Sequence, residues 1–220
     1  MGWGGVPGRQ GAVVDRWIRA RRQRSGAPAR LLIATGNPGK LSEYRALLAG
    51  CGFELEGHET GVAEDAGSYA VNATLKAEAA SSAGGVPALG DDSGLEVVAL
   101  GGFPGLHSAR LASTQDERHQ LLFARLQGVA RPWRARFVCA LALAVPERPT
   151  RVFMGEREGE VVESRSSGTG FGYDPVFLVP EVGKTFAEMT PDEKHRWSHR
   201  GAALKALRDS GALTEISQND

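Results

Sequence analysis

The sequence predicts an α/β protein built on a mixed, elongated sheet. From Arg30 onward, strand-like and helix-like segments alternate along the chain. Two long apolar stretches follow one another within residues 133–157, and neighbouring long strands favour a mixed sheet over a purely parallel, doubly wound one. With 220 residues, of which 41% are hydrophobic, the chain can bury a core as one large domain or two small ones.

Seven strands and four helices are expected. The strand segments are residues 30–35, 53–58, 86–91, 94–100, 134–145, 150–156 and 174–180. The helical segments are residues 39–49, 71–83, 115–127 and 191–210. The last of these has a clear start, because Thr190 and Glu193 have the spacing of a capping box, with Pro191 at the first helical position. Ser198 can cap a second helix, so residues 191–210 form either one helix or a broken pair.

The first 29 residues have a different composition from the rest. Residues 1–30 contain seven Arg and one Asp, with Gly, Pro and Ser around them. We expect residues 1–29 to be a disordered extension, because this composition cannot form a packed core. An organellar transit peptide is the alternative, since such peptides are also rich in Arg and poor in acidic residues.

Charge and cysteine content exclude several functional classes. Lys and Arg together number 26, as do Asp and Glu, so no overall positive charge favours nucleic acid or an anionic membrane as a partner. No apolar run approaches the roughly 18 residues of a membrane span. Cys51 and Cys139 are the only cysteines, which indicates neither a disulfide framework nor a zinc cluster. A reducing, cytoplasmic location is therefore expected.

The segment "ATGNPGK", residues 34–40, is the first candidate site. It lies between an apolar strand and a helix, where backbone amides and the start of the helix can hold an anion. Thr35 and Asn37 are expected to donate from their side chains and Lys40 to supply a point charge, so phosphate is the natural ligand. The spacing of Gly36 and Gly39 differs from that of a Walker A loop. An ordinary turn with a surface lysine is the alternative.

Two pairs of acidic residues are candidates for metal binding. Asp91 and Asp92 end an apolar segment in "LGDDSGL", with Ser93 and Gly94 expected to form a turn. Adjacent carboxylates raise each other's pKa unless a cation such as Mg²⁺ neutralises them, and a carboxylate beside the metal can activate water. An Asx turn is the alternative.

The second pair is Glu64 and Asp65. It precedes a predicted helix on which Asn72 and Lys76, four residues apart, share one face. By itself this pair would be interpreted as a solvated surface feature.

Two further segments can bind a planar base and its substituents. In "GTGFGYDPVF", residues 168–177, glycines allow close approach of the backbone, and Phe171 and Tyr173 offer aromatic faces ahead of Asp174. Its alternative is a glycine-rich hairpin. The segment "EKHRWSHRGAALKAL" supplies hydrogen-bond donors for phosphate or base carbonyl oxygens at Lys194, His199 and Arg200; its alternative is a helix with a solvated basic face.

Together these motifs resemble the Ham1-like inosine triphosphate pyrophosphatases, which hydrolyse non-canonical purine nucleoside triphosphates. The resemblance runs from about Leu31 to Leu207 and rests on "ATGNPGK", "NATLKAEAA", "GDDSGLEVVALGGFPGLHSAR", "GTGFGYDPVF" and "SHRGAALKAL". It implies a single domain over residues 30–215, in which an elongated mixed sheet divides two α/β lobes with the nucleotide cleft between them. It also implies Mg²⁺-dependent attack of water on the α-phosphorus of ITP, dITP or XTP, and a homodimer.

The resemblance assigns roles to particular residues. Asp92 is implied as the general base and a metal ligand, with either Glu64 or Asp65 as the second ligand. The substrate-binding residues implied are Thr35, Gly36, Asn37, Pro38, Gly39, Lys40, Lys76, Ser93, Phe171, Gly172, Tyr173, Asp174, Lys194, His199 and Arg200. Those at the phosphate end would hold the triphosphate, and donors at the other end would read the 6-oxo group of the base.

Two other functions stay open on the sequence alone. A Maf-like pyrophosphatase acting on other modified nucleotides would share the phosphate loop and the carboxylates. A non-catalytic nucleotide-binding protein would bind without turnover, although it would be expected to have lost a carboxylate, and both Asp91 and Asp92 are present.

Overall fold

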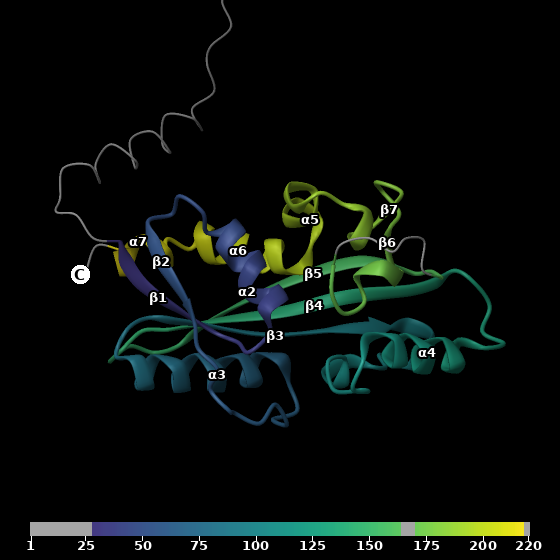
Figure 1. The fold of residues 1–220 in the computed structure, drawn as a ribbon, viewed down its shortest axis with the longest axis horizontal. Helices are drawn as coiled ribbons and strands as arrows, with labels where there is room; N and C mark the ends of the chain where they lie inside the picture. Colours follow the sequence, from purple (N-terminus) through teal and green to yellow (C-terminus); the bar gives the residue numbers. More distant parts are fainter. Residues whose placement is uncertain (1–27, 164–169, 218–220) are drawn as a thin grey trace, which may run out of the picture.

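The described residues form one mixed seven-stranded sheet with helices on both faces (Figure 1). The computed structural model describes residues 28–163 and 170–217. The strands are β1 (Ala29–Ala34), β2 (Phe53–Gly57), β3 (Ala88–Val97), β4 (Trp133–Ala144), β5 (Arg151–Val161), β6 (Phe177–Val179) and β7 (Lys184–Thr185), in the order β2-β1-β3-β4-β5-β6-β7. Strand β1 is parallel to β2 and β3, and all later pairs are antiparallel. The predicted mixed, elongated sheet is confirmed.

The helices are α2 (Pro38–Leu47), α3 (Tyr69–Gly84), α4 (Gln115–Leu126), α5 (Pro191–Trp197), α6 (His199–Asp209) and α7 (Ala212–Ser217). Helices α3 and α4 cover one face of the sheet, and α2, α5 and α6 lie over the other (Figure 1). On the second face, Leu204 and Leu207 pack with Leu31 and Leu141 in one apolar cluster. This burial of apolar surface on both faces is the main source of stability in such a sheet.

Small residues let α3 and α6 approach the centre of the sheet closely. A Cβ at Gly90 would lie 2.2 Å from the carbonyl oxygen of Ala73 in α3. On the other face, a Cβ at Gly155 would lie 2.2 Å from the backbone nitrogen of Ala203 in α6. Both distances are far below contact, so glycine is required at each position. The two helices are thereby held against β3 and β5 on opposite faces of the sheet.

Of the two alternatives for residues 191–210, the broken pair of helices is present, with the break at Ser198. Thr190 Oγ1 accepts from the Glu193 amide at 3.2 Å, and the Glu193 carboxylate accepts from the Thr190 amide, which completes the capping box of α5. Ser198 Oγ accepts from the Gly201 amide at 3.0 Å and caps α6. The capped break places His199 and Arg200 in the first turn of a new helix.

One turn prediction and one strand prediction were wrong. The turn expected at Ser93 and Gly94 is absent, because β3 is continuous and pairs with β4 from Ala88 opposite Ala144 to Val97 opposite Ala135. The backbone pairing with β4 therefore overrides the local turn preference of the Asp-Asp-Ser-Gly segment. The strand expected at 174–180 begins instead with a 3₁₀ turn over Asp174–Val176, which leaves only Phe177–Val179 as strand β6.

Residues 1–27 lie outside the described part of the chain, as do Gly168 and Thr169 of the glycine-rich segment. The extension predicted over residues 1–29 was wrong at its end, because Ala29 is the first residue of strand β1 and is buried; over residues 1–27 it stays a prediction. Among the described helices, none combines the length and the apolarity needed to cross a bilayer.

Candidate active site

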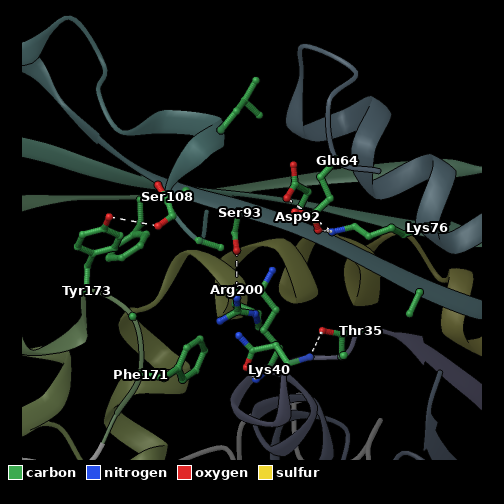
Figure 2. A pocket seen from close by; sticks show the side chains of 18 of the residues that line it. Thr35, Lys40, Glu64, Lys76, Asp92, Ser93, Ser108, Phe171, Tyr173 and Arg200 are labelled. Atoms are coloured by element: carbon green, nitrogen blue, oxygen red, sulfur yellow. Dashed lines mark hydrogen bonds and ion pairs between the residues drawn. The ribbon is translucent and has the colours of Figure 1, made fainter. Parts of the chain in front are cut away.

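One cavity of about 440 Å³ collects most of the predicted site residues (Figure 2). It lies where the loop after β1, the middle of β3, the start of α6 and the segment before β6 meet. The predicted residues that line it are Thr35, Gly36, Asn37, Lys40, Glu64, Lys76, Asp92, Ser93, Phe171, Gly172, Tyr173, Asp174, His199 and Arg200. Pro38, Gly39, Asp65 and Lys194, which the sequence also predicted, do not line it.

The loop after β1 starts helix α2 at one end of the cavity. Asn37 is the N-cap residue, and its Oδ1 accepts from the amides of Gly39 at 2.9 Å and Lys40 at 3.2 Å. Thr35 Oγ1 accepts from the Asn37 amide at 3.1 Å. The expectation of open amides was thus wrong at these three positions, since capping already uses them. Thr35 and Asn37 both line the cavity, so the Thr35 hydroxyl, the Asn37 side-chain NH₂ group and the positive end of the helix are the groups there that suit an anion.

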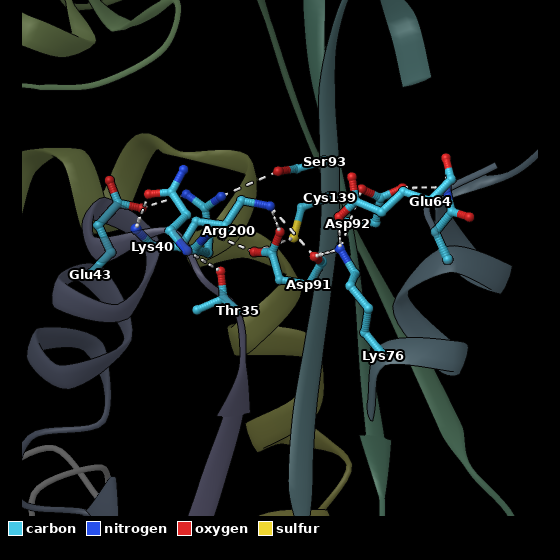
Figure 3. Close-up of polar contacts among 12 residues, drawn as sticks. Thr35, Lys40, Glu43, Glu64, Lys76, Asp91, Asp92, Ser93, Cys139 and Arg200 are labelled. Carbon is cyan, nitrogen blue, oxygen red and sulfur yellow. Dashed lines mark hydrogen bonds and ion pairs between the residues drawn. The ribbon is translucent and has the colours of Figure 1, made fainter. Parts of the chain in front are cut away.

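Asp91 and Asp92 point to opposite faces of β3 (Figure 3). Successive side chains alternate between the two faces of a strand, so adjacent residues in a continuous strand cannot share one ligand. Their partners differ accordingly: Asp91 meets α2 and α6, whereas Asp92 meets α3. The prediction that these two carboxylates act as one acidic pair was wrong.

Asp91 is a buried acceptor for basic and hydroxyl groups. Its Oδ1 accepts from Lys40 Nζ at 2.6 Å, and its Oδ2 accepts from Arg200 Nε and Tyr44 Oη, each at 2.7 Å. Burial alone would raise the pKa of this carboxyl, but Arg200 and Lys40 together hold it well below its ordinary value. Asp91 is therefore ionised, and it links Lys40 at the start of α2 to Arg200 at the start of α6.

Asp92 lies on the other face in a different environment. Asn72 Nδ2 donates to its Oδ2 at 2.9 Å, and Lys76 Nζ lies 3.6 Å from its Oδ1. Burial raises the pKa of Asp92 above its ordinary value, against the opposing effects of Lys76 and Asn72. A carboxylate with a raised pKa holds a proton more readily, which suits a general base.

Glu64 completes the group around Lys76. Its Oε1 accepts from Lys76 Nζ at 2.6 Å, and its Oε2 lies 3.7 Å from Arg110 Nη1. Burial would raise the pKa of Glu64, but the hydrogen bond from Lys76 and its charge lower it, so the carboxylate is ionised. The neighbouring Asp65 is exposed and does not line the cavity.

The donor set at this position fits a magnesium ion. Within residues 28–163 and 170–217, no group of three or more His, Cys, Asp or Glu side chains is arranged to hold a metal. Mg²⁺ is usually bound through one or two carboxylates together with substrate phosphates and water. Glu64 and Asp92 are two such carboxylates, they line the same cavity, and Lys76 now offsets their charge.

The other end of the cavity is aromatic. Phe171 lies against the start of α2, since a Cβ at Gly39 would come within 2.6 Å of its ring. Tyr173 is buried, and its hydroxyl donates to the Ser108 carbonyl at 3.2 Å; burial raises its pKa to about 12. Asp174 Oδ2 accepts from the Phe171 amide at 2.8 Å, so Asp174 shapes the segment rather than the cavity floor.

Lys194 contacts the residues at the aromatic end of the cavity but does not line the cavity itself. Its Nζ donates to Asp174 Oδ2 at 2.6 Å and to Glu43, and it lies 4.8 Å from the centre of the Phe171 ring. The charge of Lys194 is neutralised by two carboxylates, and its contacts with Phe171 and Asp174 help to hold these two cavity-lining residues in place.

Arg200 and His199 form the floor between the two ends. Arg200 is 2% exposed and donates to Asp91, Glu43 and, at 3.3 Å, to Ser93 Oγ. His199 stacks on Phe137 with ring centroids 4.5 Å apart, and its buried Nδ1 has no hydrogen-bond partner. Burial and the neighbouring Arg200 hold the pKa of His199 well below its ordinary value, so the imidazole is neutral.

Several residues of this region were missed by sequence reasoning. They are Glu43, Tyr44, Ser108, Gln115, Arg118 and His119. Gln115 and Arg118 line the cavity from the first turns of α4, and Glu43 and Tyr44 lie in the helix after the phosphate loop. Glu43 and Tyr44 lie one helical turn after Lys40, so helical spacing could have placed them on the same face of α2 as Lys40. The sequence of α4 contains no comparable motif.

Known proteins match this chain over most of its length. The model of the Ham1 family matches residues 31–210. A dITP/XTP pyrophosphatase from Gloeobacter violaceus is 48% identical over 179 residues, covering 80% of this chain and 91% of that protein. A dITP/XTP pyrophosphatase from Thermus thermophilus is 45% identical over 188 residues, covering 82% and 91%.

Solved structures agree in fold. A HAM1 protein from Coxiella burnetii superposes with a TM-score of 0.72 at 36% identity, covering 85% of this chain and 99% of that one. The Staphylococcus aureus Ham1 protein gives a TM-score of 0.71 at 34% identity, covering 82% and 97%. The predicted resemblance is confirmed, and the chain belongs to the Ham1 family.

Proposed function

We propose that this protein hydrolyses non-canonical purine nucleoside triphosphates, namely ITP, dITP and XTP, to the monophosphate and pyrophosphate, and so cleanses the nucleotide pool. The observation that carries the proposal is the single cavity that joins a helix N-terminus with Lys40, a carboxylate of raised pKa at Asp92 and an aromatic wall at Phe171. The relatives named dITP/XTP pyrophosphatase support the choice of substrate.

The triphosphate would bind between α2 and α3. Thr35 and Asn37 offer side-chain donors there, and the N-terminus of α2 favours negative charge. Lys40 and Lys76 reach the region from opposite sides of β3. In the ligand-free protein each lysine is paired with a carboxylate, so both ammonium groups are held in place before substrate arrives.

Glu64 and Asp92 would hold Mg²⁺, which supplies charge neutralisation of the phosphate oxygens when it is bound. Asp92 would accept a proton from the attacking water, while the hydrogen bond from Asn72 fixes the orientation of its carboxylate. Asp65 is left out of this role, because it is exposed and does not line the cavity.

The base would lie against Phe171, over Arg200 and His199. A 6-oxo group accepts hydrogen bonds, whereas the 6-amino group of adenine presents donors. Arg200 carries only donors, and five N–H groups exceed the three acceptors that it contacts. A 6-amino purine would leave such buried donors unpaired, which is how a site rejects the wrong base.

We extend the proposal to a homodimer in the cytoplasm. The family resemblance underlies the dimer, and the two free thiols of Cys51 and Cys139 are compatible with a reducing compartment. Sedimentation velocity on the purified chain tests the dimer directly.

Pyrophosphate release across a nucleotide panel tests the function. ITP, dITP, XTP, ATP, GTP, dUTP and dTTP would be compared with and without Mg²⁺. We expect rapid release from the first three, little from ATP or GTP, and loss of activity with EDTA that Mg²⁺ restores. Preference for dUTP or dTTP would favour the Maf-like alternative, and binding without turnover would favour a nucleotide-binding protein.

A further inference from the structure

Three hydrogen bonds help to hold the segment from Gly170 to Asp174, in addition to the one that Lys194 donates to Asp174 Oδ2 at 2.6 Å; one of the three lies within the segment and two come from other parts of the chain. Asp174 accepts from the Phe171 amide within the segment, and the Tyr173 hydroxyl donates to Ser108. The third contact comes from helix α4, where His119 Nε2 lies 2.8 Å from the carbonyl oxygen of Gly172. No motif recognised in the sequence involves His119.

The third contact requires that Nε2 of His119 carries a hydrogen. A backbone carbonyl only accepts hydrogen bonds, so Nε2 must carry a hydrogen and donate it. The imidazole also lies against the ring of Tyr173, with centroids 5.6 Å apart and planes at 40°. His119 therefore contacts the segment at two successive residues, one through a hydrogen bond and one through ring packing.

Gly172 is the position at which the direction of the segment is set. Its φ of 63° is in the left-handed region, where few side chains are tolerated. Phe171 and Tyr173 flank it, and both line the cavity. Because a peptide unit is planar, holding the Gly172 carbonyl restricts how the backbone on either side can rotate.

We infer that His119 is a positioning residue for nucleotide binding, which holds the Gly172 carbonyl so that Phe171 and Tyr173 present a preformed wall to the base. The inference rests on the proposed function. Without the hydrogen bond the segment samples more conformations, and the ordering cost is paid at binding. The loss falls on substrate affinity, because His119 contacts no group in the Asp92, Glu64 and Lys76 cluster.

Three substitutions separate the hydrogen bond from the ring contact. His119→Gln keeps a donor, His119→Phe keeps a ring, and His119→Ala removes both while suiting a helix. Gln120→Ala, at an exposed position of the same helix, is the control. We expect His119→Phe and His119→Ala to raise KM for ITP, and Kd for inosine monophosphate measured by calorimetry, about three- to tenfold, with kcat within about twofold. His119→Gln should restore most of the affinity.

Hydrogen–deuterium exchange gives a readout that does not need turnover. In the ligand-free protein, amides of residues 171–174 should exchange faster in His119→Phe and His119→Ala than in wild type or His119→Gln. Unchanged exchange together with unchanged KM in these two variants would overturn the inference. Equal impairment of the Gln and Phe variants would also overturn it, since the hydrogen bond would then not matter. Absence of ITP hydrolysis by the wild type would instead reject the proposed function.

Discussion

Arg200 Nε donates to Oδ2 of Asp91 at 2.7 Å, and both side chains are at most 2% exposed. The pair joins helix α6 to the centre of β3 across the floor of the cavity. Glu43 accepts a further hydrogen bond from Arg200, and Lys40 donates to Asp91, so two basic and two acidic groups alternate. Lys194 also donates to Glu43. Removing one member of such a buried network leaves its remaining charges unbalanced.

We therefore expect strong coupling between these two residues. Arg200→Gln or Asp91→Asn alone should lower the free energy of unfolding by about 3–5 kcal/mol, because each leaves the buried network with an excess charge. The double substitution should cost clearly less than the sum of the two, since it removes both charges. Urea unfolding of the four proteins measures the coupling. Additive costs would contradict the ionic role of the pair, and Arg134→Gln, at an exposed position of β4, serves as the control.

The identity of the second metal ligand yields a matched pair of substitutions. Glu64→Gln should raise the Mg²⁺ concentration for half-maximal ITP hydrolysis by at least about tenfold, because it removes one of the two cavity-lining carboxylates proposed to hold the ion. Asp65→Asn should leave that concentration nearly unchanged, since Asp65 is exposed. Magnesium titrations of both variants measure this, and the reverse ranking would assign the ligand to Asp65.

The parts of the site that are local in sequence could be predicted. The strand, turn and helix around residues 34–40 follow from short-range signals, and so does the break at Ser198, whose cap involves a residue only three positions away. The role of Asp91 could not be predicted, because its partners Tyr44 and Arg200 lie 47 and 109 residues away. Only the folded sheet reveals which face of β3 each aspartate occupies.

Strand β3 shows how long-range pairing changes a local expectation. Asp92, Ser93 and Gly94 have turn preferences, and the sequence accordingly predicted a turn. In the fold, the same residues pair with Ala140, Cys139 and Val138 of β4. A Cβ at Gly94 would lie 2.3 Å from the carbonyl oxygen of Gly105, so this glycine serves close packing instead. Glycine at position 94 is therefore explained by close packing against Gly105 and not by a turn.

His199 predicts a pH dependence of stability. Burial and Arg200 hold its pKa in the folded state well below the ordinary value of 6.5. As the pH falls below 6.5, the unfolded chain gains a proton that the folded chain does not, so the free energy of unfolding decreases. His199→Gln cannot titrate, and its stability should decline less from about pH 7.5 to about pH 5.5. Urea unfolding across this range is the measurement, with the exposed His107→Gln as control. Parallel curves for wild type and His199→Gln would refute the prediction.

Asp92 is the residue proposed to activate the attacking water. Water is a weak nucleophile at neutral pH and a triphosphate repels anions, so hydrolysis needs a carboxylate that orients and deprotonates the water. Asp92→Asn keeps the size of the side chain and its place opposite Asn72 and Lys76, so the fold should persist. Loss of a general base typically costs about 10²–10⁴ in rate, and more when a metal ligand is lost with it. Asp91→Asn is a poor control because it disturbs the buried network, whereas the exposed Asp116→Asn in α4 is suitable. We expect kcat for ITP to fall at least about a hundredfold in Asp92→Asn, while Kd for inosine monophosphate stays within about threefold of wild type. Turnover near the wild-type rate in a folded Asp92→Asn preparation would show that another group activates the water.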